Sequence, residues 1–182
     1  MRRAREKQQY LRIQAWTLTE SQPEVALALL DEYFALGAHF DMAQAFVDRA
    51  KACLSLDQVD DAIRSYQAAL ARESEYASLK TQAYIELPYL IATRSIERLF
   101  PVALKLLWDH RQRLIFTVDH FRWQAAMAFL AAGTDPGTAQ TRAKLALEIA
   151  SREHSGFRYH PTVGLVGPEH DGVLRSLSAL AG

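Results

Sequence analysis

Arginine, histidine and tyrosine gather near the C-terminal end of the chain, where they form its most plausible group for chemistry. The group consists of Arg152, His154, Arg158, Tyr159 and His160. These side chains supply positive charge and hydrogen-bond donors, which is the chemistry that receives a phosphate or a carboxylate. A phosphate cradle also needs a Gly-rich loop that enters a helix, and residues 164–172 resemble one only faintly. The sequence therefore leaves two interpretations open: a small anionic ligand or short peptide binds here, or the charges face water while Phe157 and Tyr159 close the end of a groove.

Other reactive residues do not form a recognisable catalytic or metal-binding set. Cys53 is the only cysteine and lies among alanines, so we expect a small buried residue rather than a nucleophile. The histidines at positions 154, 160 and 170 match no spacing typical of metal ligands. The adjacent Asp–His pairs at 109–110 and 119–120 point to different sides of a helix and make no dyad. We therefore expect no enzyme, no metal and no cofactor.

Length and charge limit the classes of partner. The chain has 182 residues, of which 49% are hydrophobic and 23% charged, as in an ordinary globular protein. Its 21 basic and 21 acidic residues cancel, which argues against a main role in binding nucleic acid or an anionic membrane. The arginines between positions 94 and 122 show no recurring pair of the kind that reads RNA. The absence of a signal sequence, of a long apolar run and of a second cysteine predicts a cytoplasmic protein without a membrane partner.

The charges are unevenly distributed along the chain. The net charge is +3 over residues 1–22, −6 over residues 23–61 and +3 over residues 62–114. An acidic segment followed by a basic one can orient a partner, or a second copy of the chain in a homodimer. Solvated outer faces of helices are the simpler interpretation.

The elements that must position these residues are helices. Hydrophobic residues recur with helical spacing up to position 155, and no sustained alternation predicts a strand. Pro23 is placed to open a helix, Gly37 to end one, and Asp41 or Asp57 to cap the helix that follows. We expect helices at about 4–19, 24–36, 40–55, 58–73, 76–94, 98–112, 117–132 and 138–153, which pair into four hairpins.

The chain changes character after Ser155. Glycine and proline are frequent between residues 156 and 172, which predicts an irregular segment. Hydrophobic residues then recur with helical spacing and predict a last short helix at about 171–180 that covers the final hairpin. The sequence therefore predicts a helical domain at residues 1–155, and a tail at residues 156–182 packed on it.

Residues 43–74 resemble a tetratricopeptide repeat, a helical hairpin of about 34 residues. The likeness rests on large and small apolar residues at the positions that the family uses: Phe46, Ala50, Ala62, Tyr66 and Ala69. The family's turn glycine is replaced by Asp57 and its closing proline by Ser74, and the other hairpins match more loosely. The resemblance implies an all-α, right-handed superhelix of about four hairpins, whose first helices line a concave groove. By family position, the groove residues of this hairpin are Gln44, Val47, Asp48, Lys51 and Leu54.

The resemblance implies a non-catalytic scaffold or adaptor that binds a protein segment or peptide in its groove. Val47 and Lys51 stand where some family members hold a peptide carboxylate with a lysine and an asparagine, so that clamp is not reproduced. The alternative is a sensory or regulatory module that uses the cluster at 152–160. A third interpretation is the partner-binding arm of a longer regulator, with the basic start of the chain as its edge.

Overall fold

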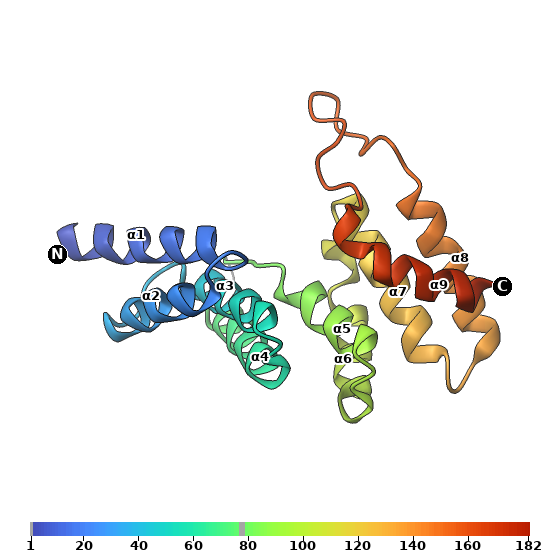
Figure 1. The fold of residues 1–182 in the computed structure, drawn as a ribbon, viewed down its shortest axis with the longest axis horizontal. Helices are drawn as coiled ribbons and strands as arrows, with labels where there is room; N and C mark the ends of the chain where they lie inside the picture. Colours follow the sequence, from blue (N-terminus) through green and yellow to red (C-terminus); the bar gives the residue numbers. More distant parts are fainter. Residues whose placement is uncertain (1, 77–78) are drawn as a thin grey trace. The chain divides into compact units, whose positions relative to one another are not determined.

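The computed structural model describes residues 2–76 and 79–182 and is all-helical over them, with 73% of residues in helices and no strand (Figure 1). The chain forms two compact units, which we call unit 1 (residues 1–83) and unit 2 (residues 84–182). Each unit has its own hydrophobic core. Each is therefore described separately.

Unit 1 consists of two helical hairpins. Helix α1 pairs with α2, and α3 pairs with α4, while α2 and α1 both contact α3. The connections are short, as the sequence predicts. The helices are α1 (Arg2–Leu18), α2 (Pro23–Ala35), α3 (Met42–Ser55) and α4 (Val59–Glu75).

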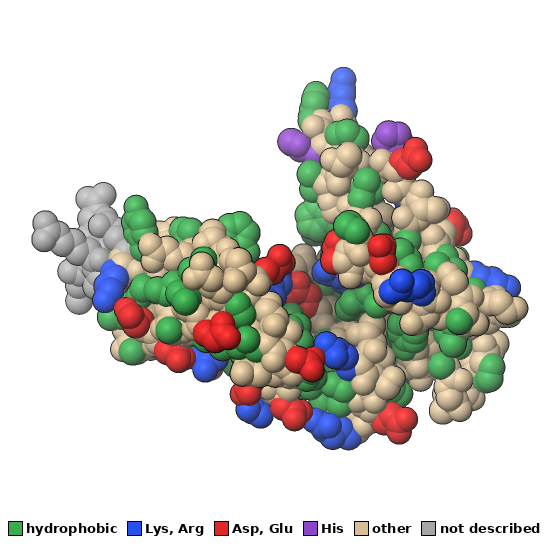
Figure 2. All heavy atoms as spheres, viewed as in Figure 1, with side chains coloured by type: hydrophobic (Ala, Val, Ile, Leu, Met, Phe, Trp, Pro, Cys, Tyr) green, Lys and Arg blue, Asp and Glu red, His purple; other side chains and the backbone are tan. Residues whose placement is uncertain are grey.

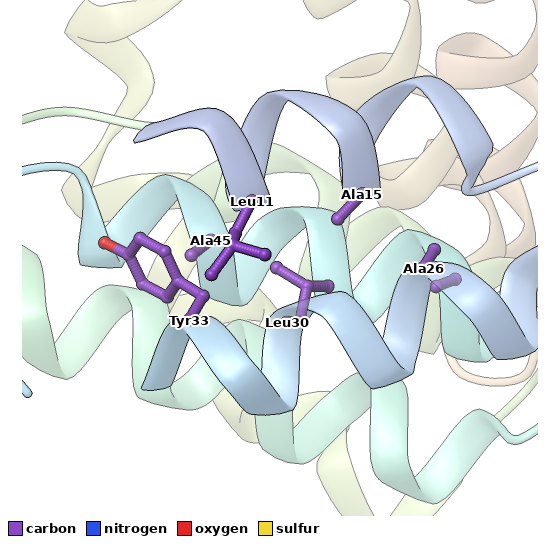
Figure 3. Close-up of a cluster of buried hydrophobic side chains, with 7 residues drawn as sticks. Leu11, Ala15, Ala26, Leu30, Tyr33 and Ala45 are labelled. Atoms are coloured by element: carbon purple, nitrogen blue, oxygen red, sulfur yellow. The ribbon is translucent and has the colours of Figure 1, made fainter. Parts of the chain in front are cut away.

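The core of the first hairpin joins α1 to α2 through small and large apolar side chains (Figure 3). Leu11 and Ala15 of α1 point toward Leu30 and Tyr33 of α2, and all four are at most 7% exposed. Alanine at position 15 lets the two backbones approach, and the larger side chains fill the remaining space. Burying a leucine side chain of this kind contributes roughly 1.5–3 kcal/mol, so this interface accounts for much of the attachment of α1.

The second hairpin packs as expected from its alanines. Ala50 of α3 and Ala62 and Ala69 of α4 are fully buried, and Tyr66 of α4 is 2% exposed. Phe46 stacks instead on Phe34 of α2, with ring centroids 4.6 Å apart. This aromatic pair connects the two hairpins of unit 1.

The helix ends in unit 1 partly follow the predictions. Pro23 begins α2, and Gly37 follows its end with φ of 91°, a conformation that glycine favours. Asp57 caps no helix, because α4 has Gln58 at its cap position. Asp57 instead adopts φ of 56°, so it takes the left-handed conformation of the turn glycine that it replaces in the repeat pattern. Asp41 stands at the cap position of α3, but its side chain makes no capping hydrogen bond.

Unit 2 contains the remaining helices. Helix α7 pairs with α8, and α9 packs against α8 and more lightly against α7. Helices α5 and α6 are shorter than predicted and do not pair closely with each other in the described chain, and Pro88 lies inside α5. The α-helices are α5 (Ala83–Thr93), α6 (Phe100–Asp109), α7 (Thr117–Ala131), α8 (Pro136–Ala150) and α9 (Asp171–Ala181), and the short 3-10 helices are η1 (Glu97–Leu99), η2 (Arg111–Arg113) and η3 (Pro168–His170).

The irregular segment between α8 and α9 projects as a loop and returns to the start of α7 (Figure 1). The carbonyl of Gly164 accepts a hydrogen bond from the N–H of Val118, at 2.8 Å, in the first turn of α7. Gly164 has φ of 70°, and a Cβ there would lie 2.6 Å from a ring carbon of Phe116. Leu177 of α9 is fully buried in the core of unit 2. The tail thus packs on α7 and α8. That residues 1–155 form one helical domain stays a prediction.

A histidine is buried beside the core of unit 2. His170 is 4% exposed, and its Nδ1 lies 2.9 Å from the hydroxyl of Tyr89. Its ring also contacts Phe121, at 5.1 Å between centroids. Burial lowers the pKa of His170, and the nearby charge of Arg122 lowers it further, against a smaller opposing effect of Glu169.

Acidification is expected to destabilise the protein through His170. Its folded-state pKa lies below the ordinary value of about 6.5. The stability that the neutral ring contributes is therefore complete above about pH 6.5 and is lost as the pH falls toward the folded-state pKa. Urea denaturation across this range should show that His170→Gln, which keeps an acceptor for Tyr89, loses less stability on acidification than the wild type. The exposed His120→Gln serves as a control, and equal pH slopes for His170→Gln and the wild type would contradict the prediction.

Candidate functional site

The five predicted groove residues of α3 do not form one exposed surface. Gln44, Lys51 and Leu54 are half-buried, whereas Val47 is 1% exposed and Asp48 is fully buried. Helix α1 packs against α3, and Arg12 of α1 binds the carboxylate of Asp48. Val47 and Asp48 are therefore not exposed to a partner in this structure, and the five residues stay a prediction as a groove.

The contact between α1 and α3 is organised by a buried carboxylate, that of Asp41. The Nε of Arg12 donates a hydrogen bond to its Oδ2 at 2.6 Å, and the hydroxyl of Tyr33 donates to its Oδ1 at 2.6 Å. The Nδ1 of His39 lies 2.5 Å from the same Oδ1. The side chain of Asp41 is 9% exposed, so these partners replace its water.

A second buried carboxylate extends this network along α3. The Nη1 of Arg12 donates to Asp48 Oδ2 at 3.1 Å, and the amide of Gln44 donates to Oδ1 at 3.0 Å. Arg12 therefore bridges Asp41 and Asp48, and we call Arg12, Tyr33, His39, Asp41, Gln44 and Asp48 the Asp41 network. One arginine of α1 is thus fixed by two carboxylates at different positions along the chain.

The two carboxylates respond differently to this environment. Burial alone raises the pKa of Asp41, but hydrogen bonds from Tyr33, His39 and Arg12 outweigh it and the net pKa is lowered. For Asp48 burial dominates, and its pKa is raised despite Gln44 and Arg12. Asp41 is consequently the member whose negative charge the fold stabilises most.

This network and the hydrophobic core leave the opposite side of α1 uncovered. Tyr10 is 71% exposed, Ile13 is 43% exposed and Trp16 is 55% exposed. These residues are three positions apart and follow one side of the helix, and we call them the outer face of α1. Figure 2 shows hydrophobic side chains at the surface where α1 runs. An open hollow of about 400 Å³ beside Trp16 continues this face into the turn, lined by Trp16, Thr17, Thr19, Glu20 and Ser21.

The predicted ligand cluster lies on the projecting loop of unit 2. Its side chains are all exposed, and Tyr159 is 77% exposed. The loop is closed by the hydroxyl of Ser155, which donates to the carbonyl of His160 at 2.8 Å. The guanidinium of Arg158 lies 5.3 Å from the ring centroid of Tyr159. The structure thus brings Arg158 and Tyr159 together in the open, and the cluster stays a prediction as a ligand site.

Among the residues that the structure describes, no group of three or more His, Cys, Asp or Glu side chains is arranged to hold a metal ion. Over the same part of the chain, no helix combines the length and the apolar character that crossing a membrane requires. Comparisons of the chain with protein-family models, with curated proteins and with solved structures found no match.

Sequence reasoning missed most of the Asp41 network. Its members come from α1, α2, the connection after α2, and α3, so no local spacing reveals them together. The one local signal was Asp41 just before α3, which from the sequence alone is interpreted only as a possible helix cap. The exposed apolar residues of α1 were also missed, because a helix with apolar residues on both sides does not show which side is covered.

Loss of the Asp41 carboxylate is expected to loosen α1. Asp41→Asn keeps the size of the side chain but leaves Arg12 and His39 without its charge. We expect a loss of about 2–3 kcal/mol in the free energy of unfolding, below the ~3–5 kcal/mol of fully buried pairs because Arg12 retains some exposure. Urea denaturation monitored by circular dichroism measures it.

A matched control is Asp31→Asn, because Asp31 pairs with Arg49 on the surface and its side chain is 63% exposed. That change should cost no more than about 1 kcal/mol. Equal effects of the two substitutions would show that the Asp41 network does not anchor α1.

Proposed function

We propose that this protein is a non-catalytic scaffold that binds a segment of another protein, and that the outer face of α1 is where the segment docks. The observation that carries the proposal is the exposure of Tyr10, Ile13 and Trp16 on a helix that buries Leu11 and Ala15 on its other side. Aromatic residues are enriched among those that dominate binding energy in protein interfaces. Exposed apolar residues aligned on one helix are typical of an interaction surface.

The size of this face favours a segment over a second copy of the chain. A large side chain has a surface of roughly 150–250 Å². The exposed fractions of Tyr10, Ile13 and Trp16 therefore correspond to about 350 Å² of exposed surface in total. A stable dimer buries about 800 Å² on each subunit. A short amphipathic segment that places two or three apolar side chains against α1, with one of them in the hollow beside Trp16, matches the area available.

The proposed architecture for this role is the tetratricopeptide-like one that the sequence resembles. It is supported by the hairpins α1–α2, α3–α4 and α7–α8, and by the buried alanines at the expected positions of α3 and α4. Asp57 in a left-handed turn also accords with the repeat pattern. We further propose a cytoplasmic location, with which the unpaired, buried Cys53 accords.

Site-specific cross-linking tests the proposal directly. A photoreactive phenylalanine analogue at position 16 should capture a distinct protein in the native cells, whereas the same group at exposed position 105 of unit 2 should not. Ile13→Asp should lower the affinity for the captured protein at least about tenfold, because removal of one buried aliphatic contact is worth roughly 1.5–3 kcal/mol.

The matched control is Gln14→Asp, which introduces the same charge at the neighbouring exposed position of α1. The proposal is wrong if both substitutions weaken binding equally, or if position 16 cross-links only to a second copy of this chain.

A further inference from the structure

Unit 2 carries an unusual combination of two tryptophans and two arginines drawn from four elements. Trp123 of α7 is 2% exposed, and its Nε1 donates a hydrogen bond to the carbonyl of Leu107 at 3.0 Å. Trp108 of α6 meets its ring edge-on, with centroids 5.6 Å apart. The guanidinium of Arg111 lies 5.4 Å and that of Arg142 lies 5.2 Å from the centroid of Trp123. We call these four residues the Trp123 cluster.

The arginines of the Trp123 cluster are held in place but not neutralised. The Nη1 of Arg142 donates to the side-chain oxygen of Gln124 at 3.2 Å. In the described part of the chain, neither Arg111 nor Arg142 pairs with a carboxylate. The carboxylate of Asp109, near in sequence, binds Lys105 instead, at 2.5 Å. The guanidinium groups of Arg111 and Arg142, both next to the buried ring of Trp123, can therefore still donate hydrogen bonds to an anionic partner.

We propose that the Trp123 cluster is a second docking site, and that it binds an acidic peptide segment through side-chain carboxylates. A guanidinium that lies near an aromatic ring keeps N–H groups available for a carboxylate. Contact with the ring also restricts these long side chains beforehand, which lowers the entropic cost of binding. Trp108 is 50% exposed and supplies an apolar contact for a neighbouring side chain of the segment. This proposal is independent of the outer face of α1.

The surroundings favour an acidic segment over a nucleic acid or a small ligand. Unit 2 contains eleven Lys and Arg residues and nine Asp and Glu residues. Its net charge is therefore too small for the sustained positive field that binding of a phosphate backbone requires. Trp108 and Arg111 are exposed at the surface, whereas small ligands are mostly enclosed in a concave site. Tryptophan and arginine together are typical of the residues that dominate protein interfaces.

Fluorescence anisotropy of the full chain tests this proposal with a short fluorescein-labelled peptide of alternating Glu-Glu-Phe units. Its Gln-Gln-Phe counterpart and a labelled oligothymidine serve as the comparison probes. The acidic peptide should bind, more weakly as salt increases, and better than either comparison probe. Replacement of both arginines (Arg111→Gln with Arg142→Gln) should weaken binding about tenfold or more, since each charge-assisted hydrogen bond is worth about that factor.

The control Arg175→Gln removes the same charge from an exposed position of α9, where the arginine has no aromatic contact among the described residues, and should leave the affinity unchanged. Trp108→Ala, at an exposed position, is a second variant that should also weaken binding without disturbing the fold. Ile13→Asp should have no effect, which separates this site from the outer face of α1. The proposal is overturned if the acidic peptide does not bind, if oligothymidine binds more tightly, or if the double arginine variant binds as well as the wild type.

Discussion

The attachment of α1 depends on one buried carboxylate, that of Asp41. It accepts hydrogen bonds from Arg12 of α1 and Tyr33 of α2, and it contacts His39 in the connection that precedes α3. These contacts join α1, α2 and the connection before α3, and removing one partner of a buried ion pair costs far more than removing an exposed one. The core around Leu30 supplies the non-directional attraction, while Asp41 fixes the position in which α1 is held.

This position of α1 determines what the rest of unit 1 presents to solvent. Arg12 contacts Asp48, which is fully buried, whereas Ile13 and Trp16 of the same helix are exposed. The proposed docking surface is for this reason on α1 and not on α3. In the proposed scaffold role, specificity comes from the apolar residues that the fold leaves exposed, which here include Trp16 beside an open hollow.

The sequence predicts the helices well because their periodicity and breaks are local. Pro23 and Gly37 mark helix ends where the structure has them, and the alanines of α3 and α4 are buried as the repeat pattern predicts. The candidate site could not be predicted in the same way. Burial of Asp48 depends on a contact with Arg12, 36 positions away, and such a pairing leaves no local signal. Helices α5 and α6 were predicted too long, and Pro88 lies inside α5 and not at a helix end.

Hydrogen–deuterium exchange of the full chain, alone and bound to the segment recovered by cross-linking, tests the central claim most directly. Binding at the outer face of α1 should slow amide exchange in α1, where opening of the helix must first displace the segment. Exchange in the loop at residues 152–160 should not change. Slower exchange confined to that loop, or unchanged exchange in α1 at saturating segment, would contradict the claim that α1 is the docking helix.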